Sequence, residues 1–162
     1  MPAAIYAGSF DPPTNGHVWM IHHGVRMFDV LYVAVGENPD KAYTFSLEQR
    51  LNMLKEITKD LANIRVISFS NKFLAQFARE NKIEFILRGI RSWKDYEFER
   101  GMRYINEDIW GGITTVFLMP PRHLCEISSS MVKGLVGPEG WQNIVGQYVP
   151  PPVLKVLIEK FS

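Results

Sequence analysis

The chain has 162 residues, of which 46% are apolar and 22% are charged, and its formal net charge is +1 at pH 7. These values are typical of one globular domain, residues 1–162, and they give no global indication of a nucleic-acid or membrane partner. The single cysteine, Cys125, excludes a disulfide framework, and no apolar run approaches the roughly 20 residues that cross a bilayer. No signal peptide is predicted, so the expected location is cytoplasmic.

Apolar runs alternate with helical patterns along the whole chain. In chain order the predicted elements are a strand over Ala3–Ala7, a helix over Gly16–Phe28, a strand over Val30–Gly36, a helix from Ser46 to about Ile57, a strand over Asn63–Phe69, a helix over Asn71–Asn81, a strand over Ile83–Gly89, a helix over Lys94–Ile109, a strand over Ile113–Met119, and short helices to the end. Because the strands are apolar on both faces, the pattern predicts an α/β fold. We expect a Rossmann-like, doubly wound, five-stranded parallel sheet of order 3-2-1-4-5 with a helical C-terminal tail.

In such sheets ligands bind at the carboxyl ends of the strands, where the strand order reverses. With the order 3-2-1-4-5 that point lies between the first and fourth strands. The first strand ends in the loop Gly8–His17, "GSFDPPTNGH", and the fourth ends in Leu87–Arg91, "LRGIR". The fifth strand leads to Ile127–Leu135, "ISSSMVKGL". We therefore expect these three loops to face one crevice.

Each of these loops carries groups that bind anions. His17 at a helix start and Ser9 can donate hydrogen bonds to phosphoryl oxygens, and the arginine fork at Arg88 and Arg91 suits phosphate. Serine hydroxyls precede the helix at Ile127–Leu135. Taken singly, each feature is as well explained by a turn, a solvated surface or a helix cap. Their occurrence together predicts phosphoryl or nucleotidyl transfer, in which positioning and charge stabilisation do most of the catalysis.

Histidine spacing gives no indication of a metal site. His22 and His23 follow His17 by five and six residues, and at 3.6 residues per turn neither shares a helical face with it. We therefore predict no metal-ligating residues in the chain.

Two of the loops resemble the signatures of the nucleotidylyltransferase superfamily, namely "GSFDPPTNGH" and "ISSSMVK". Between them the sequence is similar to the bacterial phosphopantetheine adenylyltransferase family, through Arg88–Arg91, Asp95–Glu99 and Asn106. The motif "FSLEQR" at Phe45–Arg50 and the motif Phe77-Ala78-Arg79 add to this resemblance. The similarity extends from about Ile5 to the C-terminal helix.

The resemblance implies a reaction and a set of residues for it. The family transfers the adenylyl group of ATP to 4′-phosphopantetheine in the penultimate step of coenzyme A synthesis, without a covalent enzyme intermediate. Mg²⁺ is expected to enter with ATP, and the chain is expected to form a homo-oligomer, namely a hexamer. The implied catalytic residues are His17, Lys41, Arg91 and Ser129. The implied acceptor-binding residues are Ser9, Lys41, Leu74, Arg88, Met102 and Asn106. The implied ATP-binding residues are Ser9, Phe10, His17, Gly89, Ile90, Arg91, Glu99, Leu124, Cys125, Glu126, Ile127, Ser128, Ser129 and Ser130.

Within that resemblance, Leu124 and Glu126 replace residues that are usually aromatic or small. Since stacking contributes to nucleotide affinity, we expect ATP to be preferred but bound more weakly than an aromatic residue would allow. Three alternatives remain: a sister transferase with another phosphate substrate, a non-catalytic nucleotide-binding regulator and a flavodoxin-like electron carrier. The segment with Arg88, Glu99 and Asn106 argues against the first, and His17 argues against the other two.

Overall fold

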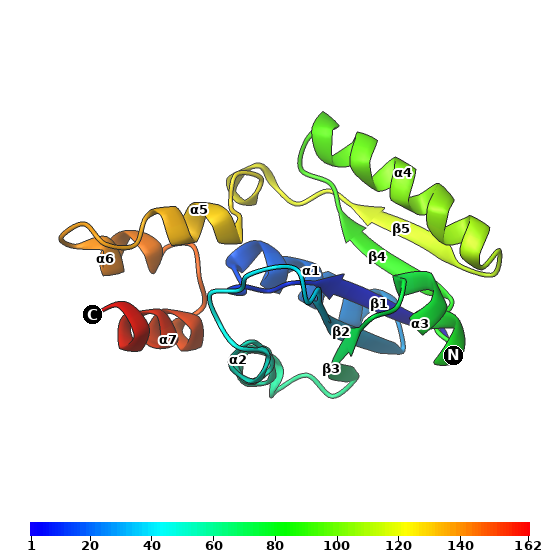
Figure 1. Ribbon diagram of the computed structural model, residues 1–162, viewed down its shortest axis with the longest axis horizontal. Helices are drawn as coiled ribbons and strands as arrows, with labels where there is room; N and C mark the ends of the chain where they lie inside the picture. Colours follow the sequence, from blue (N-terminus) through cyan, green and yellow to red (C-terminus); the bar gives the residue numbers. More distant parts are fainter.

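The computed structural model describes residues 1–162 and contains a five-stranded parallel sheet covered by helices (Figure 1). The strands are β1 (Ala3–Gly8), β2 (Val30–Glu37), β3 (Ile64–Ser70), β4 (Phe85–Gly89) and β5 (Thr114–Leu118). Their order is β3-β2-β1-β4-β5, and every neighbouring pair is parallel. The predicted sheet and its order are therefore confirmed, with strand ends shifted by no more than two residues.

Helices fill the connections between the strands, and further helices follow the last one. They are α1 (Asn15–Met27), α2 (Leu47–Thr58), α3 (Leu74–Glu80), α4 (Trp93–Ile109), the 3₁₀ turn η1 (Arg122–Leu124), α5 (Ser129–Gly134), α6 (Trp141–Val145) and α7 (Pro151–Phe161). A capping box begins α2, since Ser46 Oγ accepts the Gln49 N–H and Gln49 Oε1 accepts the Ser46 N–H. No helix combines the length with the apolarity that a membrane crossing demands.

Side chains of β1 alternate between two buried clusters, one on each face of the sheet. Ala4 and Tyr6 belong to the cluster that includes Met20 and Ile21 of α1. Their neighbours Ile5 and Ala7 belong instead to the cluster that includes Ala78 of α3. Because both faces of β1 are covered, the strand is apolar throughout, as a central parallel strand must be.

The C-terminal helices form a third cluster beyond the carboxyl ends of the strands. Val132, Trp141, Val145, Val153 and Leu157 pack there against α2 and the residue Phe45 before it. Figure 1 shows α5, α6 and α7 together on the side toward which the arrowhead of β1 points. This extension places the start of α5 beside the loop that follows β1. The C-terminal segment therefore forms one wall of the crevice.

Candidate functional site

Two adjoining cavities open at the carboxyl ends of the central strands. The first, called here the β1–β4 cavity, has a volume of about 260 Å³ and is lined from β1, α1, β4, α4 and the segment before α5. The second, the β1–β2 cavity, has a volume of about 370 Å³ and is lined from β1, β2, β3 and α3. Both cavities share Ala7, Gly8 and Arg88 in their walls. The three loops expected to face one crevice do meet, at the predicted reversal of strand order.

The structure places most of the predicted site residues in these walls. The β1–β4 cavity is lined by His17, Arg88, Gly89, Arg91, Glu99, Leu124, Ile127, Ser128 and Ser129. The β1–β2 cavity is lined by Ser9, Lys41, Leu74 and Arg88. The predicted residues that line neither cavity are Phe10, Ile90, Met102, Asn106, Cys125, Glu126 and Ser130.

Each of these seven residues lies elsewhere for a local reason. The Phe10 ring is 1% exposed and packs edge-on against His17 at 4.9 Å, so it is part of the core. The Cys125 thiol faces the Pro120 and Pro121 carbonyls, at 3.6 and 3.5 Å. The Ile90 N–H donates to the Leu118 carbonyl across the sheet. Met102 and Asn106 lie further along α4 than Glu99, while Glu126 and Ser130 are exposed.

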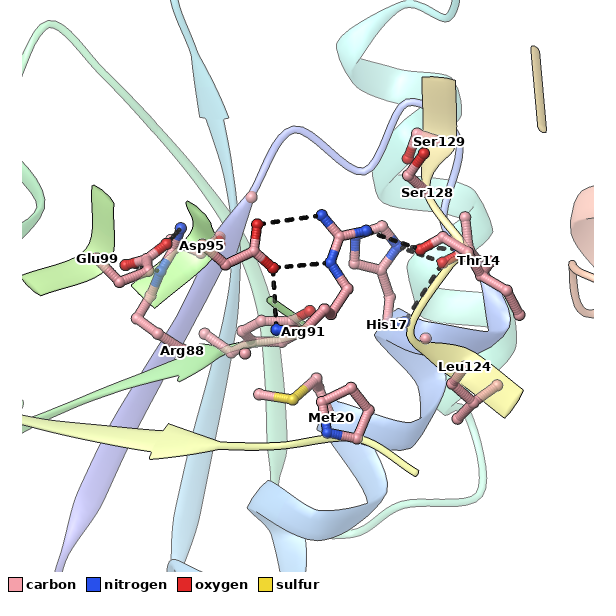
Figure 2. A pocket seen from close by; sticks show the side chains of 17 residues that line it. Thr14, His17, Met20, Arg88, Arg91, Asp95, Glu99, Leu124, Ser128 and Ser129 are labelled. Carbon is pink, nitrogen blue, oxygen red and sulfur yellow. Dashed lines mark hydrogen bonds and ion pairs between the residues drawn. The ribbon is translucent and has the colours of Figure 1, made fainter. Parts of the chain in front are cut away.

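His17 is held by the residue that begins its own helix. Its Nδ1 accepts the backbone N–H of Thr14 at 2.9 Å and lies 3.1 Å from Thr14 Oγ1. Because Nδ1 is the acceptor, the neutral ring carries its proton on Nε2. Burial and the nearby charges of Arg91 and Arg88 lower the pKa of His17 from 6.5 to about 4. At neutral pH the ring is therefore an uncharged hydrogen-bond donor at the cavity wall (Figure 2).

Arg88 is fixed at the boundary between the two cavities. Its Nε and one terminal nitrogen bind the two Glu99 carboxylate oxygens at 3.0 and 2.6 Å, and the other terminal nitrogen donates to the Ala7 carbonyl at 2.8 Å. Glu99 is 7% exposed, so this bidentate pair is largely screened from solvent. Three of the five guanidinium N–H groups are thus used, and the others remain able to bind an anion.

Arg91 links α4 to the segment that precedes α5. Its Nε donates to Asp95 Oδ2 at 3.0 Å, and a terminal nitrogen donates to the Ile127 carbonyl at 3.0 Å (Figure 2). Partial burial acts to raise the pKa of Asp95, but hydrogen bonds from Arg91 outweigh it and the pKa is lowered. Beyond Ile127, Ser128 caps α5, and Ser129 Oγ donates to the Pro12 carbonyl at 2.7 Å. Arg91 and the start of α5 are therefore held against the β1–α1 loop.

The β1–β2 cavity carries one cation that no carboxylate pairs. Lys41 is exposed on the connection between β2 and α2, and its Nζ lies 3.4 Å from Ser9 Oγ. The ammonium also lies 5.6 Å from the centre of the Tyr43 ring. A hydroxyl and an ammonium at this spacing suit a single phosphate group.

Arg50 and Asp11 position this cavity, and sequence reasoning did not single them out. Arg50 is fully buried and binds Glu37 Oε1 at 2.5 Å, the Ser9 carbonyl at 3.0 Å and the Phe45 carbonyl at 3.1 Å. Asp11 accepts the N–H groups of Thr44 and Phe45, and Lys133 of α5 lies 3.3 Å from its Oδ2. These contacts tie the loop that carries Ser9 to the connection that carries Lys41. The available signals were the motif "FSLEQR" and a charged residue on the apolar face formed by Met53 and Leu54.

The family model and the curated relatives that match this chain agree on one family. The profile of a family described as cytidylyltransferase-like matches residues 5–135. A phosphopantetheine adenylyltransferase from Chromobacterium violaceum is 52% identical over 162 residues, which is 100% of this chain and 99% of the relative. One from Neisseria meningitidis serogroup B is 57% identical over 157 residues, which is 96% of this chain and 92% of the relative.

Solved structures agree in fold. Nicotinic acid mononucleotide adenylyltransferase from Plasmodium falciparum, complexed with NaAD, has a TM-score of 0.67 at 20% identity and covers 99% of this chain and 98% of its own. A putative nicotinate-nucleotide adenylyltransferase from Vibrio parahaemolyticus has a TM-score of 0.66 at 18% identity, with 98% and 99% covered. At such identities the likeness shows the fold alone.

Proposed function

Because this chain belongs to the cytidylyltransferase-like family, and within it to the phosphopantetheine adenylyltransferases, we propose that it transfers the adenylyl group of ATP to 4′-phosphopantetheine. The products would be dephospho-coenzyme A and pyrophosphate. The structural observation that carries the proposal is the meeting of two cavities at Arg88, each with its own anion-binding groups. A transfer between two phosphorylated substrates needs two such subsites in contact.

The residues of each cavity suit one of the two substrates. In the β1–β4 cavity, ATP would be held by His17, Arg91, Leu124, Ile127, Ser128 and Ser129. In the β1–β2 cavity, Ser9 and Lys41 would hold the acceptor phosphate, with Arg88 between the two subsites. An oxygen of the acceptor phosphate would form a bond to the α-phosphorus of ATP. The bond from that phosphorus to the bridging oxygen would break, and pyrophosphate would leave with its electron pair.

Catalysis in this proposal rests on position and charge rather than on a nucleophilic side chain. The neutral Nε2–H of His17 would donate to an oxygen on which negative charge increases in the transition state. Arg88 and Arg91 would balance the charge of the phosphates, and their carboxylate partners prevent the guanidinium groups from moving away. Both effects require the two substrates to be bound together, which makes their alignment a large part of the rate enhancement.

Mg²⁺ would enter as part of the ATP substrate, coordinated by phosphate oxygens. The two carboxylates in the β1–β4 cavity, Asp95 and Glu99, are both paired with arginines. No group of three or more His, Cys, Asp or Glu side chains is arranged to hold an ion. Because Mg²⁺ commonly binds through substrate phosphates and water, it needs no dedicated set of protein ligands here.

One assay tests this function against its alternatives. Pyrophosphate release would be measured with ATP alone, with ATP and 4′-phosphopantetheine, with ATP and nicotinate mononucleotide, and with CTP in place of ATP. Release that depends on both ATP and 4′-phosphopantetheine is the expected result. Release only with nicotinate mononucleotide would make the chain a sister transferase, and ATP binding without release would make it a regulator.

We also propose that the chain acts in the cytoplasm as a homo-oligomer, with a hexamer as the expected state. Large apolar side chains on α4 are exposed, with Trp93 at 71%, Phe98 at 64% and Ile105 at 46%. Phe98 and Ile105 are seven residues apart and so share one face of α4, and exposed apolar side chains on one helix face support a contact with another chain. Light scattering should report about six times the 18.6 kDa of one chain, and a monomer at micromolar concentration would contradict the proposal.

A further inference from the structure

Tyr6 brings a hydroxyl group to the β1–β4 cavity that no predicted role accounts for. The residue lies on β1, is only 7% exposed, and lines the cavity together with His17, Arg88 and Arg91. No backbone or side-chain group forms a hydrogen bond with its hydroxyl. The only fully enclosed side-chain polar atom without a partner is Thr115 Oγ1, so the Tyr6 hydroxyl is not sealed inside the protein. It therefore opens to the cavity.

The ring that carries this hydroxyl is held in one place. It packs edge-on against Phe10 with 5.5 Å between ring centroids, and the His17 ring centroid lies 6.4 Å away. Both Tyr6 and Phe10 belong to the core cluster beneath α1. A buried tyrosine normally finds a hydrogen-bond partner, because leaving its hydroxyl unpaired costs free energy. A fixed hydroxyl at a cavity wall, without a hydrogen-bond partner in the protein, can therefore form a hydrogen bond with a bound ligand.

The charges around Tyr6 indicate what kind of ligand this is. Burial raises the pKa of Tyr6, and although Arg88 and Arg91 act against this, the phenol stays protonated and able to donate. The carboxylates of the same cavity, Glu99 and Asp95, are already bound by these two arginines. A donor placed among cations and engaged carboxylates favours an anionic acceptor, which here means a phosphate oxygen.

We propose that the Tyr6 hydroxyl donates a hydrogen bond to a phosphate oxygen of the bound ATP. This inference rests on the proposed function, since it takes the β1–β4 cavity to be the nucleotide subsite. It adds a binding residue within β1 itself. Tyr6 precedes Gly8 in the chain, whereas Ser9 lies in the loop that follows Gly8. The side chain would act on ATP and leave the acceptor untouched, because Tyr6 lines the β1–β4 cavity and is absent from the β1–β2 cavity.

The test compares Tyr6→Phe, which removes only the hydroxyl, with Tyr32→Phe as a matched control. Tyr32 lies on β2 and packs against the cluster on the other face of the sheet. Calorimetric titration would give the Kd of ATP and of 4′-phosphopantetheine for both variants and for the unchanged chain. A hydrogen bond to a charged group contributes about 1.5–3 kcal/mol, so Tyr6→Phe should weaken ATP binding about 10-fold or more. Its Kd for 4′-phosphopantetheine, and both constants of Tyr32→Phe, should stay within about twofold.

Two results would overturn the inference. One is an ATP Kd that Tyr6→Phe leaves within twofold, which would mean that the hydroxyl contacts water alone. The other is a loss confined to 4′-phosphopantetheine, which would place Tyr6 in the acceptor subsite. Pyrophosphate release by the unchanged chain is measured alongside. If that activity is absent while Tyr6→Phe still weakens ATP, the proposed function fails and the nucleotide contact of Tyr6 stands.

Discussion

Replacing His17 by glutamine or by asparagine distinguishes its two ring nitrogens as hydrogen-bond donors. Nδ1 of His17 accepts the Thr14 N–H at 2.9 Å, so the donor available to a substrate is Nε2. A glutamine amide can place an N–H near the position of Nε2, whereas the shorter asparagine amide reaches only the position of Nδ1. If Nε2–H stabilises charge on the reacting phosphate, His17→Gln should retain more activity than His17→Asn.

The expected sizes follow from what each variant loses. Removing one donor to a developing negative charge typically lowers kcat by about 100- to 1,000-fold, and we expect that loss for His17→Asn. His17→Gln keeps a donor in imperfect geometry, and a loss of about 1 kcal/mol of hydrogen-bond energy corresponds to less than about 10-fold in kcat. The KM for ATP should change far less than kcat in both variants, because the interaction belongs to the transition state.

The pH dependence gives a second measure of the same hydrogen bond. With the pKa of His17 lowered to about 4 in the free protein, kcat/KM should show no loss from His17 protonation between pH 8 and pH 5, because kcat/KM reports the ionisation of the free enzyme. An unfolded chain has an ordinary histidine pKa of about 6.5, so below that pH it binds a proton that the folded chain does not. The free energy of unfolding contributed by His17 is therefore fully present above pH 6.5 and falls as the pH drops toward 4. Because the His17 ring is half-buried, its lowered pKa changes the free energy of unfolding by at most about 3 kcal/mol.

Three measurements test the reasoning on His17. Nitrogen-15 spectra of the imidazole at pH 7 should show the proton on Nε2. The other two measurements are the pH profile of kcat/KM and the kcat values of the two variants. A proton on Nδ1 would refute the assignment, as would an acid limb of kcat/KM near pH 6.5 that His17→Gln abolishes. Equal kcat values for His17→Gln and His17→Asn would show that Nε2 is not the donor.

Two further predictions concern the β1–β2 cavity. Lys41→Ala should raise the KM for 4′-phosphopantetheine about 10-fold or more and leave the Kd of ATP within twofold, because its ammonium contacts only Ser9 and Tyr43 there. Weakened ATP binding with unchanged 4′-phosphopantetheine binding in calorimetry would mean that the two subsites are exchanged. Lys59→Ala serves as the surface control. Arg50→Met should lower the free energy of unfolding by about 3 kcal/mol, since it removes a buried cation from three acceptors. Denaturant titration beside Arg65→Met, an exposed arginine, checks this, and equal stability of the two variants would contradict it.

Periodicity was sufficient to predict the sheet because most of the strands are short apolar runs between polar turns. The run Val30–Gly36, for example, is apolar on both faces because β2 packs against a buried cluster on each side of the sheet. The reversal of strand order then places the ends of β1 and β4 together, which is why the sequence alone predicts His17 and Arg88 in one crevice.

Arg50 could not be found in this way, because its role arises from contacts that join distant segments. Helical patterns place charged residues on the outer face, yet Arg50 is fully buried and its partners Ser9 and Glu37 lie 41 and 13 residues away. Asp11 is similar, since Lys133 lies 122 residues further along the chain. Local sequence carries no information on such pairs, and only the folded loops show which carbonyls a buried guanidinium must satisfy.

Gly16 offers a way to separate what the β1–α1 loop does for stability from what it does for ligands. A Cβ at Gly16 would lie 3.5 Å from Thr14 Oγ1 and 3.9 Å from the Ile127 carbonyl, which are ordinary contacts, so the protein itself does not exclude a methyl group. Gly16 is within α1, where alanine in place of glycine stabilises a helix by about 0.5–1 kcal/mol. Gly16 also lines the β1–β4 cavity, so the added methyl would occupy space that a nucleotide needs. Gly16→Ala should therefore unfold at a higher denaturant concentration and bind ATP several-fold more weakly. A variant that is both more stable and unchanged in ATP affinity would show that the nucleotide does not approach this turn of α1.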